Sequence, residues 1–137
     1  LLVTLTGPAL AQDRHMTVHK DPNCGCCTAW AELAEKAGYS VSVIETGDIA
    51  ADKAQAGVPE ALWSCHTARI DGYVIEGHVP FDALARLLET RPDVLGIAVP
   101  GMPAGSPGMG DDPAARYEVI AWGGKAGDGA QFQKVGD

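Results

Sequence analysis

The sequence predicts an α/β fold in which helices flank a mixed sheet and a β-rich extension follows at the C-terminus. In the first half of the chain, β-prone runs alternate with helical runs, which predicts parallel strands joined by a right-handed crossover. The dipeptide Asp71-Gly72 separates two apolar runs and predicts an antiparallel hairpin. Parallel and antiparallel pairs together predict one mixed sheet with helices packed on it.

The first predicted strand and helix lie on either side of a cysteine-rich turn. Residues 15–20 are short and β-prone, and the turn-forming residues 21–23 end this strand. A helix is expected at 28–37, because Gly38 is a natural C-terminal stop. One face of this helix is apolar and consists of Trp30, Leu33, Ala34 and Ala37.

The next elements continue the alternating pattern. Residues 39–45 alternate and contain β-branched side chains, as expected for a strand. Asp48 can cap a short helix that runs to Ala56. Residues 60–66 give no clear pattern, so their structure is left open.

The hairpin and a third helix follow. The hairpin strands are expected at 67–70 and 73–76, and a helix at 80–90, since proline is tolerated at a helix start. The inward face of this helix consists of Phe81, Leu84, Leu87 and Leu88. Residues 100–113 are too rich in glycine and proline for regular structure. The remaining expected segments are 94–99 (a short strand or an extended run), 117–122 and 131–135.

This order of elements, with cysteines after the first strand and at the start of the first helix, resembles the thioredoxin fold. Cys24 and Cys27 have the Cys-x-x-Cys spacing of that superfamily. In such proteins the loop before the hairpin packs against the cysteine pair, and residues 64–66 take that place here. The resemblance therefore implies that Cys65 and His66 lie beside the first cysteines.

Length and charge limit the possible functions. A chain of 137 residues is expected to form one domain, here residues 15–137. The net charge of −8 argues against a nucleic acid or an anionic membrane surface as partner. We expect no membrane span in the mature chain, because no stretch approaches the roughly 18 apolar residues that a spanning helix needs.

Residues 1–11 are expected to be the remnant of a signal peptide. Their apolar run ends in Ala9-x-Ala11, which fits a cleavage site, and Gln12 would be the first mature residue. The alternative is an ordinary N-terminal strand. Export would bring the chain to an oxidising compartment, where disulfides can form.

Three of the four cysteines, Cys24, Cys26 and Cys27, lie within four residues at the predicted strand-to-helix junction. The partial positive charge and free N–H groups of a helix N-terminus lower the pKa of a thiol. A structural disulfide framework would usually spread its cysteines to close long loops. A dithiol that exchanges disulfides would be disturbed by further thiols nearby. Both roles stay open, but they fit this cluster less well than metal binding does.

Among metals, copper fits the cysteines best. Cys24, Cys27, Cys65 and His66 could form a four-ligand zinc site, which would leave Cys26 unexplained. Thiolates at adjacent positions can instead bridge several ions, and Cu(I) accepts two or three soft ligands. We therefore expect Cu(I), with more than one ion per chain.

Two methionines and a histidine could complete the ligand set. Met102 and Met109 lie in the Gly- and Pro-rich segment, and thioethers bind Cu(I) without deprotonation. Alternatively, these methionines fill an edge of the core. His66 directly follows the fourth cysteine and is expected to bind the metal or support a ligand, whereas His19 and His78 are weaker candidates.

Four motifs in combination resemble the CopG-type periplasmic copper-resistance proteins, which are the domain-of-unknown-function 411 family. They are Asn23-Cys24-Gly25-Cys26-Cys27, Trp63-Ser64-Cys65-His66-Thr67, Gly77-His78-Val79-Pro80, and the Gly-Met-Pro and Gly-Ser-Pro-Gly-Met runs within 101–109. The resemblance covers about residues 15–135.

This resemblance implies a thioredoxin-like, periplasmic protein of copper resistance. The thiolate ligands would be Cys24, Cys26, Cys27 and Cys65, with His66, Met102 and Met109 around them. The copper would be sequestered or relayed to other periplasmic copper-handling proteins. A thiol or copper oxidoreductase stays open as the alternative, and no catalytic residue is assigned.

Overall fold

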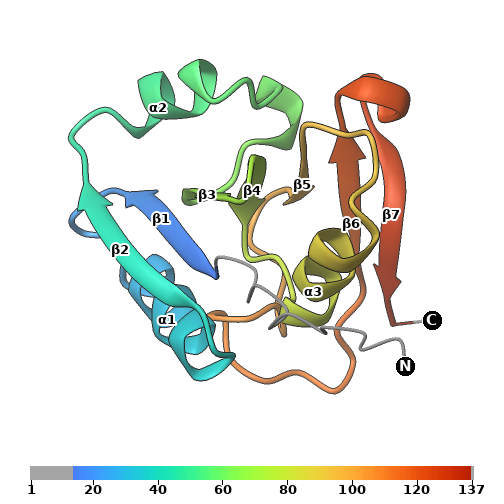
Figure 1. Cartoon of the computed structure of the whole chain (residues 1–137). Coiled ribbons are helices and arrows are strands. Elements are labelled where there is room, and N and C mark those ends of the chain that lie inside the picture. The colour runs from blue at the N-terminus through green and yellow to red at the C-terminus, as the bar shows by residue number, and fades with distance from the viewer. Residues whose placement is uncertain (1–13, 137) are drawn as a thin grey trace, which may run out of the picture.

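Seven strands form one sheet in the order β2-β1-β3-β4-β5-β6-β7 in the computed structural model, which describes residues 14–136 (Figure 1). The strands are β1 (His15–Lys20), β2 (Ser40–Glu45), β3 (Thr67–Ile70), β4 (Tyr73–Gly77), β5 (Gly96–Val99), β6 (Tyr117–Trp122) and β7 (Ala130–Val135). The helices of this part of the chain are α1 (Gly25–Lys36), α2 (Ile49–Gln55) and α3 (Phe81–Thr90), with short 3-10 helices η1 (Glu60–Leu62) and η2 (Gly124–Ala126). The predicted α/β fold with a mixed sheet and flanking helices is confirmed.

Strand β1 determines where the cysteine-bearing segments meet. It pairs in parallel with β2 and antiparallel with β3, and in the second pairing His19 lies opposite Thr67. The last residues of β1 therefore lie beside the first residue of β3. This arrangement brings the turn before α1 and the turn before β3 to the same end of the sheet, as the thioredoxin-like order of elements implies.

Helix α1 begins at Gly25, three residues before the predicted start at Thr28. Cys24 is its N-cap residue, with an extended backbone, and its carbonyl accepts a hydrogen bond from the Thr28 N–H at 3.3 Å. The predicted start was wrong because the prediction placed the whole cysteine motif in the preceding turn. As a consequence Cys26 and Cys27 lie in the first turn of the helix.

The hairpin and the C-terminal extension both belong to this sheet. Asp71 and Gly72 have φ values of 49° and 84°, and positive φ at both positions is the geometry of a type I′ turn. Strand β5 pairs in parallel with β4, and β6 and β7 continue the sheet with antiparallel pairs. Residues 94–99 thus include a strand, and the β-rich extension lengthens the sheet.

The helices cover the sheet from both sides. Helices α1 and α3 lie on one face and α2 on the other (Figure 1). Trp30 of α1 and Leu84 of α3 pack with Ile75 of β4 in the larger apolar cluster. The neighbouring residue Val74 points to the opposite face, into a smaller cluster with Trp122. Because successive side chains of β4 point to opposite faces of the sheet, this strand contributes to both layers of the core.

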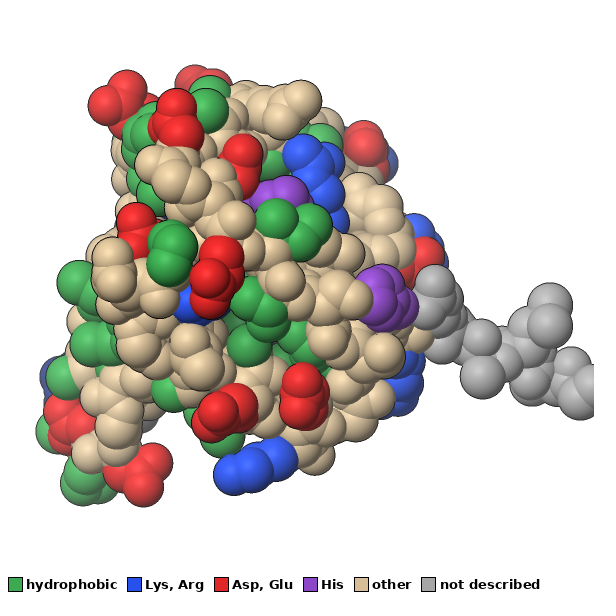
Figure 2. Space-filling model, turned by 90° about the vertical axis from the view of Figure 1, so that its left-hand side faces the viewer, with side chains coloured by type: hydrophobic (Ala, Val, Ile, Leu, Met, Phe, Trp, Pro, Cys, Tyr) green, Lys and Arg blue, Asp and Glu red, His purple; other side chains and the backbone are tan. Residues whose placement is uncertain are grey.

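Two sequence predictions concern the ends and the surface of the chain. The expected signal-peptide remnant, residues 1–11, lies outside the described residues. Within residues 14–136, no helix is long and apolar enough to cross a membrane. Acidic side chains are scattered over the face that includes the β2 side of the molecule (Figure 2), in keeping with the net charge of −8.

Candidate metal centre

The four cysteines meet at one end of the sheet. Their sulfur atoms all lie within 4.8 Å of one another. Cys26 Sγ is 3.5 Å from Cys24 Sγ and 3.8 Å from Cys65 Sγ, although Cys65 follows 39 residues later in the chain. Cys27 is fully buried and the other three are half-buried. The proximity that the thioredoxin resemblance implied is therefore present.

Two of these cysteines form a disulfide. Cys24 is bonded to Cys27, with Cα atoms 5.4 Å apart, whereas Cys26 and Cys65 are free thiols. Metals bind thiolates, and neither sulfur of a disulfide is a thiolate. All four sulfurs thus become available to a metal only after two electrons reduce this bond.

The start of α1 favours negative charge on the sulfur atoms. Cys26 and Cys27 lie in its first turn, and that turn contains no acidic residue. The unpaired N–H groups and the partial positive charge at a helix N-terminus stabilise a nearby anion. This position suits thiolates and the negative charge of a metal–thiolate cluster.

The turn before β3 gives Cys65 a different environment. Burial, and then the neighbouring Cys26 thiol, raise the pKa of Cys65 to about 11. The Ser64 side chain and the Lys53 ammonium lower this pKa only in part. Cys65 is therefore a protonated thiol at neutral pH, and a metal ion that binds it must displace the proton.

A buried ion pair supports the turn that carries Cys65. Lys53 Nζ lies 2.7 Å from Glu76 Oε2, and the same oxygen accepts a hydrogen bond from the Ser64 N–H at 2.8 Å. The Thr67 hydroxyl accepts from Lys53 at 3.1 Å and donates to Glu76 Oε1 at 2.6 Å. Because both charged groups are buried and paired, this network fixes the backbone next to Cys65.

Two buried histidines accompany the fourth cysteine. His66 directly follows it, and the His66 and His78 rings meet edge to face with centroids 5.1 Å apart. Burial lowers the pKa of both rings, and for His66, where the shift is larger, His78 and Lys53 add to the effect. Both imidazoles are therefore neutral at pH 7 and can offer a lone pair to a metal.

The predicted irregular segment lies against the cluster. A Cβ atom at Gly108 would stand 2.8 Å from the Cys26 carbonyl oxygen. The Ser64 hydroxyl donates a hydrogen bond to the Gly101 carbonyl. The 101–110 loop thus contacts Cys26 itself and Ser64, the residue that precedes Cys65.

The two loop methionines directly follow these contact points in the chain. Met102 comes after Gly101 and is 56% exposed, and Met109 comes after Gly108 and is half-buried. Neither methionine belongs to the buried core clusters. The alternative that they fill an edge of the core therefore fits Met102 poorly, and both remain candidate ligands.

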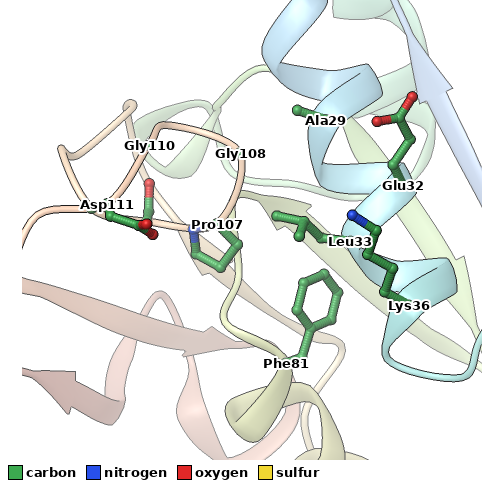
Figure 3. A pocket seen from close by; sticks show the side chains of 11 residues that line it. Ala29, Glu32, Leu33, Lys36, Phe81, Pro107, Gly108, Gly110 and Asp111 are labelled. Atoms are coloured by element: carbon green, nitrogen blue, oxygen red, sulfur yellow. The ribbon is translucent and has the colours of Figure 1, made fainter.

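A cleft of about 550 Å³ separates α1 from this loop (Figure 3). Leu33, Phe81 and Pro107 supply its apolar lining, and Glu32 and Lys36 line it from α1. No cysteine lines the cleft. It is thus a neighbour of the sulfur cluster and not the metal site itself.

Sequence patterns alone did not identify every residue around the cluster. The Lys53–Glu76 pair joins residues 23 positions apart, so no local pattern could reveal it. His19, one of the weaker candidates, lies 3.1 Å from Asp52 of α2. His78 is the histidine that the fold places beside His66.

The chain is similar to known proteins over most of its length. The family model "Protein of unknown function, DUF411" matches residues 62–109, which include Cys65, both buried histidines and both loop methionines. None of the curated proteins matches the chain. Two solved structures of "Copper resistance protein copG", Form 1 and Form 2, share 40% sequence identity with it, with TM-scores of 0.82 and 0.81. They cover 90% and 88% of this chain, which in turn spans 98% and 97% of theirs.

Proposed function

This chain belongs to the family of the copper resistance protein CopG, and the DUF411 model matches its residues 62–109; we therefore propose that its cysteine cluster holds Cu(I). The site would be bridged by cysteines, would contain more than one ion per chain, and would serve to sequester copper or relay it to other copper-handling proteins. A periplasmic location is part of this proposal, since the sequence of residues 1–11 fits the apolar end and the Ala-x-Ala cleavage site of a signal peptide. An exported chain that begins at Gln12 would agree with this location.

The observation that carries the proposal is the convergence of four sulfur atoms within 4.8 Å. Cys26 is the member that a Cys-x-x-Cys exchange pair does not need, yet it lies within 3.8 Å of both Cys24 and Cys65. Thiolates on adjacent positions suit ions that accept few soft ligands and share them. Cu(I) meets this requirement better than zinc, which takes four ligands around a single ion.

The other proposed ligands are His66, Met102 and Met109. His66 is neutral and buried next to the fourth cysteine, which suits a nitrogen ligand. The methionines belong to a loop whose glycines contact the cysteine segments at both ends. Closure of this loop over a bound cluster would bring soft thioether donors to copper.

The Cys24–Cys27 disulfide favours a second candidate function, that of a thiol or copper oxidoreductase. The bonded pair lies at the N-terminus of α1, where one sulfur of the reduced pair would be activated for attack. Turnover of a disulfide substrate by the wild-type chain would support this alternative. A Cys26→Ser variant that keeps this turnover but no longer loads copper would show that both activities coexist.

Copper titration of the reduced chain tests the proposal. Fully reduced protein, prepared without oxygen, is mixed with Cu(I) and a chromophoric chelator, and copper per chain is measured after separation. We expect the wild type to retain more than one ion per chain and a variant with all four cysteines replaced by serine to retain none. Equal copper contents in the two proteins would contradict the proposal.

A further inference from the structure

Three buried ring nitrogens next to the cysteine cluster have no hydrogen-bond partner. They are Nδ1 and Nε2 of His66 and Nε2 of His78, and no other buried side-chain nitrogen or oxygen of residues 14–136 shares this condition. Folded proteins pair nearly all buried polar atoms, because leaving one unpaired costs its full desolvation. The concentration of these atoms at one place therefore indicates a ligand.

Of the two rings, His78 has the defined orientation. Its Nδ1 lies 2.6 Å from the Pro107 carbonyl oxygen, and a carbonyl oxygen can only accept a hydrogen bond. Nδ1 must therefore carry the proton, and the lone pair of the neutral ring lies on Nε2. A histidine that binds a metal through one nitrogen typically donates the other N–H to a carbonyl or carboxylate in this way.

The position of His78 connects it to the cysteines. A Cβ atom at Gly108 would lie 2.8 Å from the Cys26 carbonyl oxygen and 3.0 Å from His78 Nδ1, so Gly108 is in close contact with both residues. The His78 ring also contacts His66, which directly follows Cys65. His78 thus approaches the cluster both through the 101–110 loop and through the turn before β3.

We infer that His78 is a further ligand of the copper centre, binding through Nε2 while the Pro107 carbonyl holds its Nδ1–H. This inference rests on the proposed copper function. The group of atoms that lie within 4.8 Å of one another contains the four sulfurs and no imidazole nitrogen. His78 would therefore bind an ion at the edge of a multinuclear cluster, where each ligand needs to contact only one of the ions.

Nitrogen NMR of the wild-type chain provides the direct test. Cu(I) is diamagnetic, so protein labelled with ¹⁵N-histidine can be followed before and after anaerobic loading, with the ¹³Cβ resonances of the cysteines as a report on the cluster. We expect the His78 Nε2 resonance to shift on loading while Nδ1 stays protonated. Cysteine resonances that change while Nε2 does not would overturn the inference, since a bridging water would then be the partner of the ring. Failure of the cysteines to bind copper would instead overturn the proposed function.

A pair of histidine variants provides the second readout. We expect His78→Gln to weaken Cu(I) binding by at least the roughly 10–100-fold that loss of an outer-shell partner costs. His15→Gln is the matched control, because His15 lies at the opposite end of β1, where its ring contacts the Ser40 and Ser42 hydroxyls, and it should bind copper as the wild type does. An affinity of His78→Gln within twofold of the control would contradict the assignment. If His78→Gln does not fold, the NMR measurement on the wild type decides.

Discussion

At the scale of single residues, Cys26 and Cys65 distinguish this cluster from a simple exchange pair. Both are free thiols, whereas Cys24 and Cys27 are bonded to each other. The sulfur atoms of Cys26 and Cys65 are 3.8 Å apart, which lets one metal ion contact both. Burial, and then the neighbouring Cys26 thiol, keep the proton on Cys65, because they raise its pKa to about 11.

The raised pKa predicts slow and strongly pH-dependent alkylation of Cys65. Iodoacetamide reacts with thiolates, and the thiolate fraction of Cys65 should keep rising up to about pH 11. An ordinary thiol, with a pKa near 8.5, would approach its full rate about 2.5 pH units lower. The measurement is the rate of modification of the Cys65 peptide by mass spectrometry in the metal-free chain.

Two controls accompany this prediction. In urea, Cys65 should react as an ordinary thiol, because burial is lost. In the Cys26→Ser variant, the alkylation rate of Cys65 should rise at lower pH than in the wild type, since Cys26 is one cause of the raised pKa. A rate for the folded wild type that levels off near pH 9 would contradict the explanation.

At the scale of elements, the site depends on three segments that approach one end of the sheet. They are the first turn of α1, the turn before β3 and the 101–110 loop. The buried Lys53–Glu76 pair holds the second of these through the Ser64 N–H. The loop approaches most closely at Gly108, where the space for a side chain is already taken by Cys26 and His78.

Substitution of Gly108 by alanine is expected to displace the loop and impair copper loading. Gly108 has φ = 92°, and the added Cβ would lie 2.8 Å from a backbone oxygen. Gly110 is the matched control, because it has φ = 81° and open space around it. Each alanine should cost about 1–3 kcal/mol of stability through its backbone. Gly108→Ala should cost more than Gly110→Ala, and it alone should lower the copper content.

Both variants are compared by urea denaturation and by copper per chain. If they lose the same stability and load the same copper, the contact between the loop and the cysteine segment has no role in the site.

At the scale of the whole molecule, local signals predicted most elements correctly. Asp48 caps α2 through a hydrogen bond from the Ala51 N–H, and Asp71-Gly72 forms the expected hairpin turn. The predicted start of α1 was wrong because glycine and cysteine have weak helix propensity. No local sequence signal marks Cys24 as the N-cap residue.

The site was less accessible to sequence reasoning than the fold. The proximity of Cys65 to the other cysteines came from a resemblance to thioredoxin, since periodicity carries no information about residues 39 positions apart. The bond from His78 to the Pro107 carbonyl joins a strand end to a loop without regular structure. Such contacts depend on how the whole chain packs, so residue patterns could suggest ligand types but not their partners.

In the proposed site, the four cysteines together bridge several Cu(I) ions. Copper X-ray absorption of the reduced, Cu(I)-loaded chain tests this claim most directly, because the spectrum reports both the donor atoms and any neighbouring copper. We expect a first shell dominated by sulfur and a second contribution from copper at short range, both of which are lost when the four cysteines are replaced by serine. A spectrum with nitrogen and oxygen donors alone, or with sulfur donors and no copper neighbour, would contradict the claim.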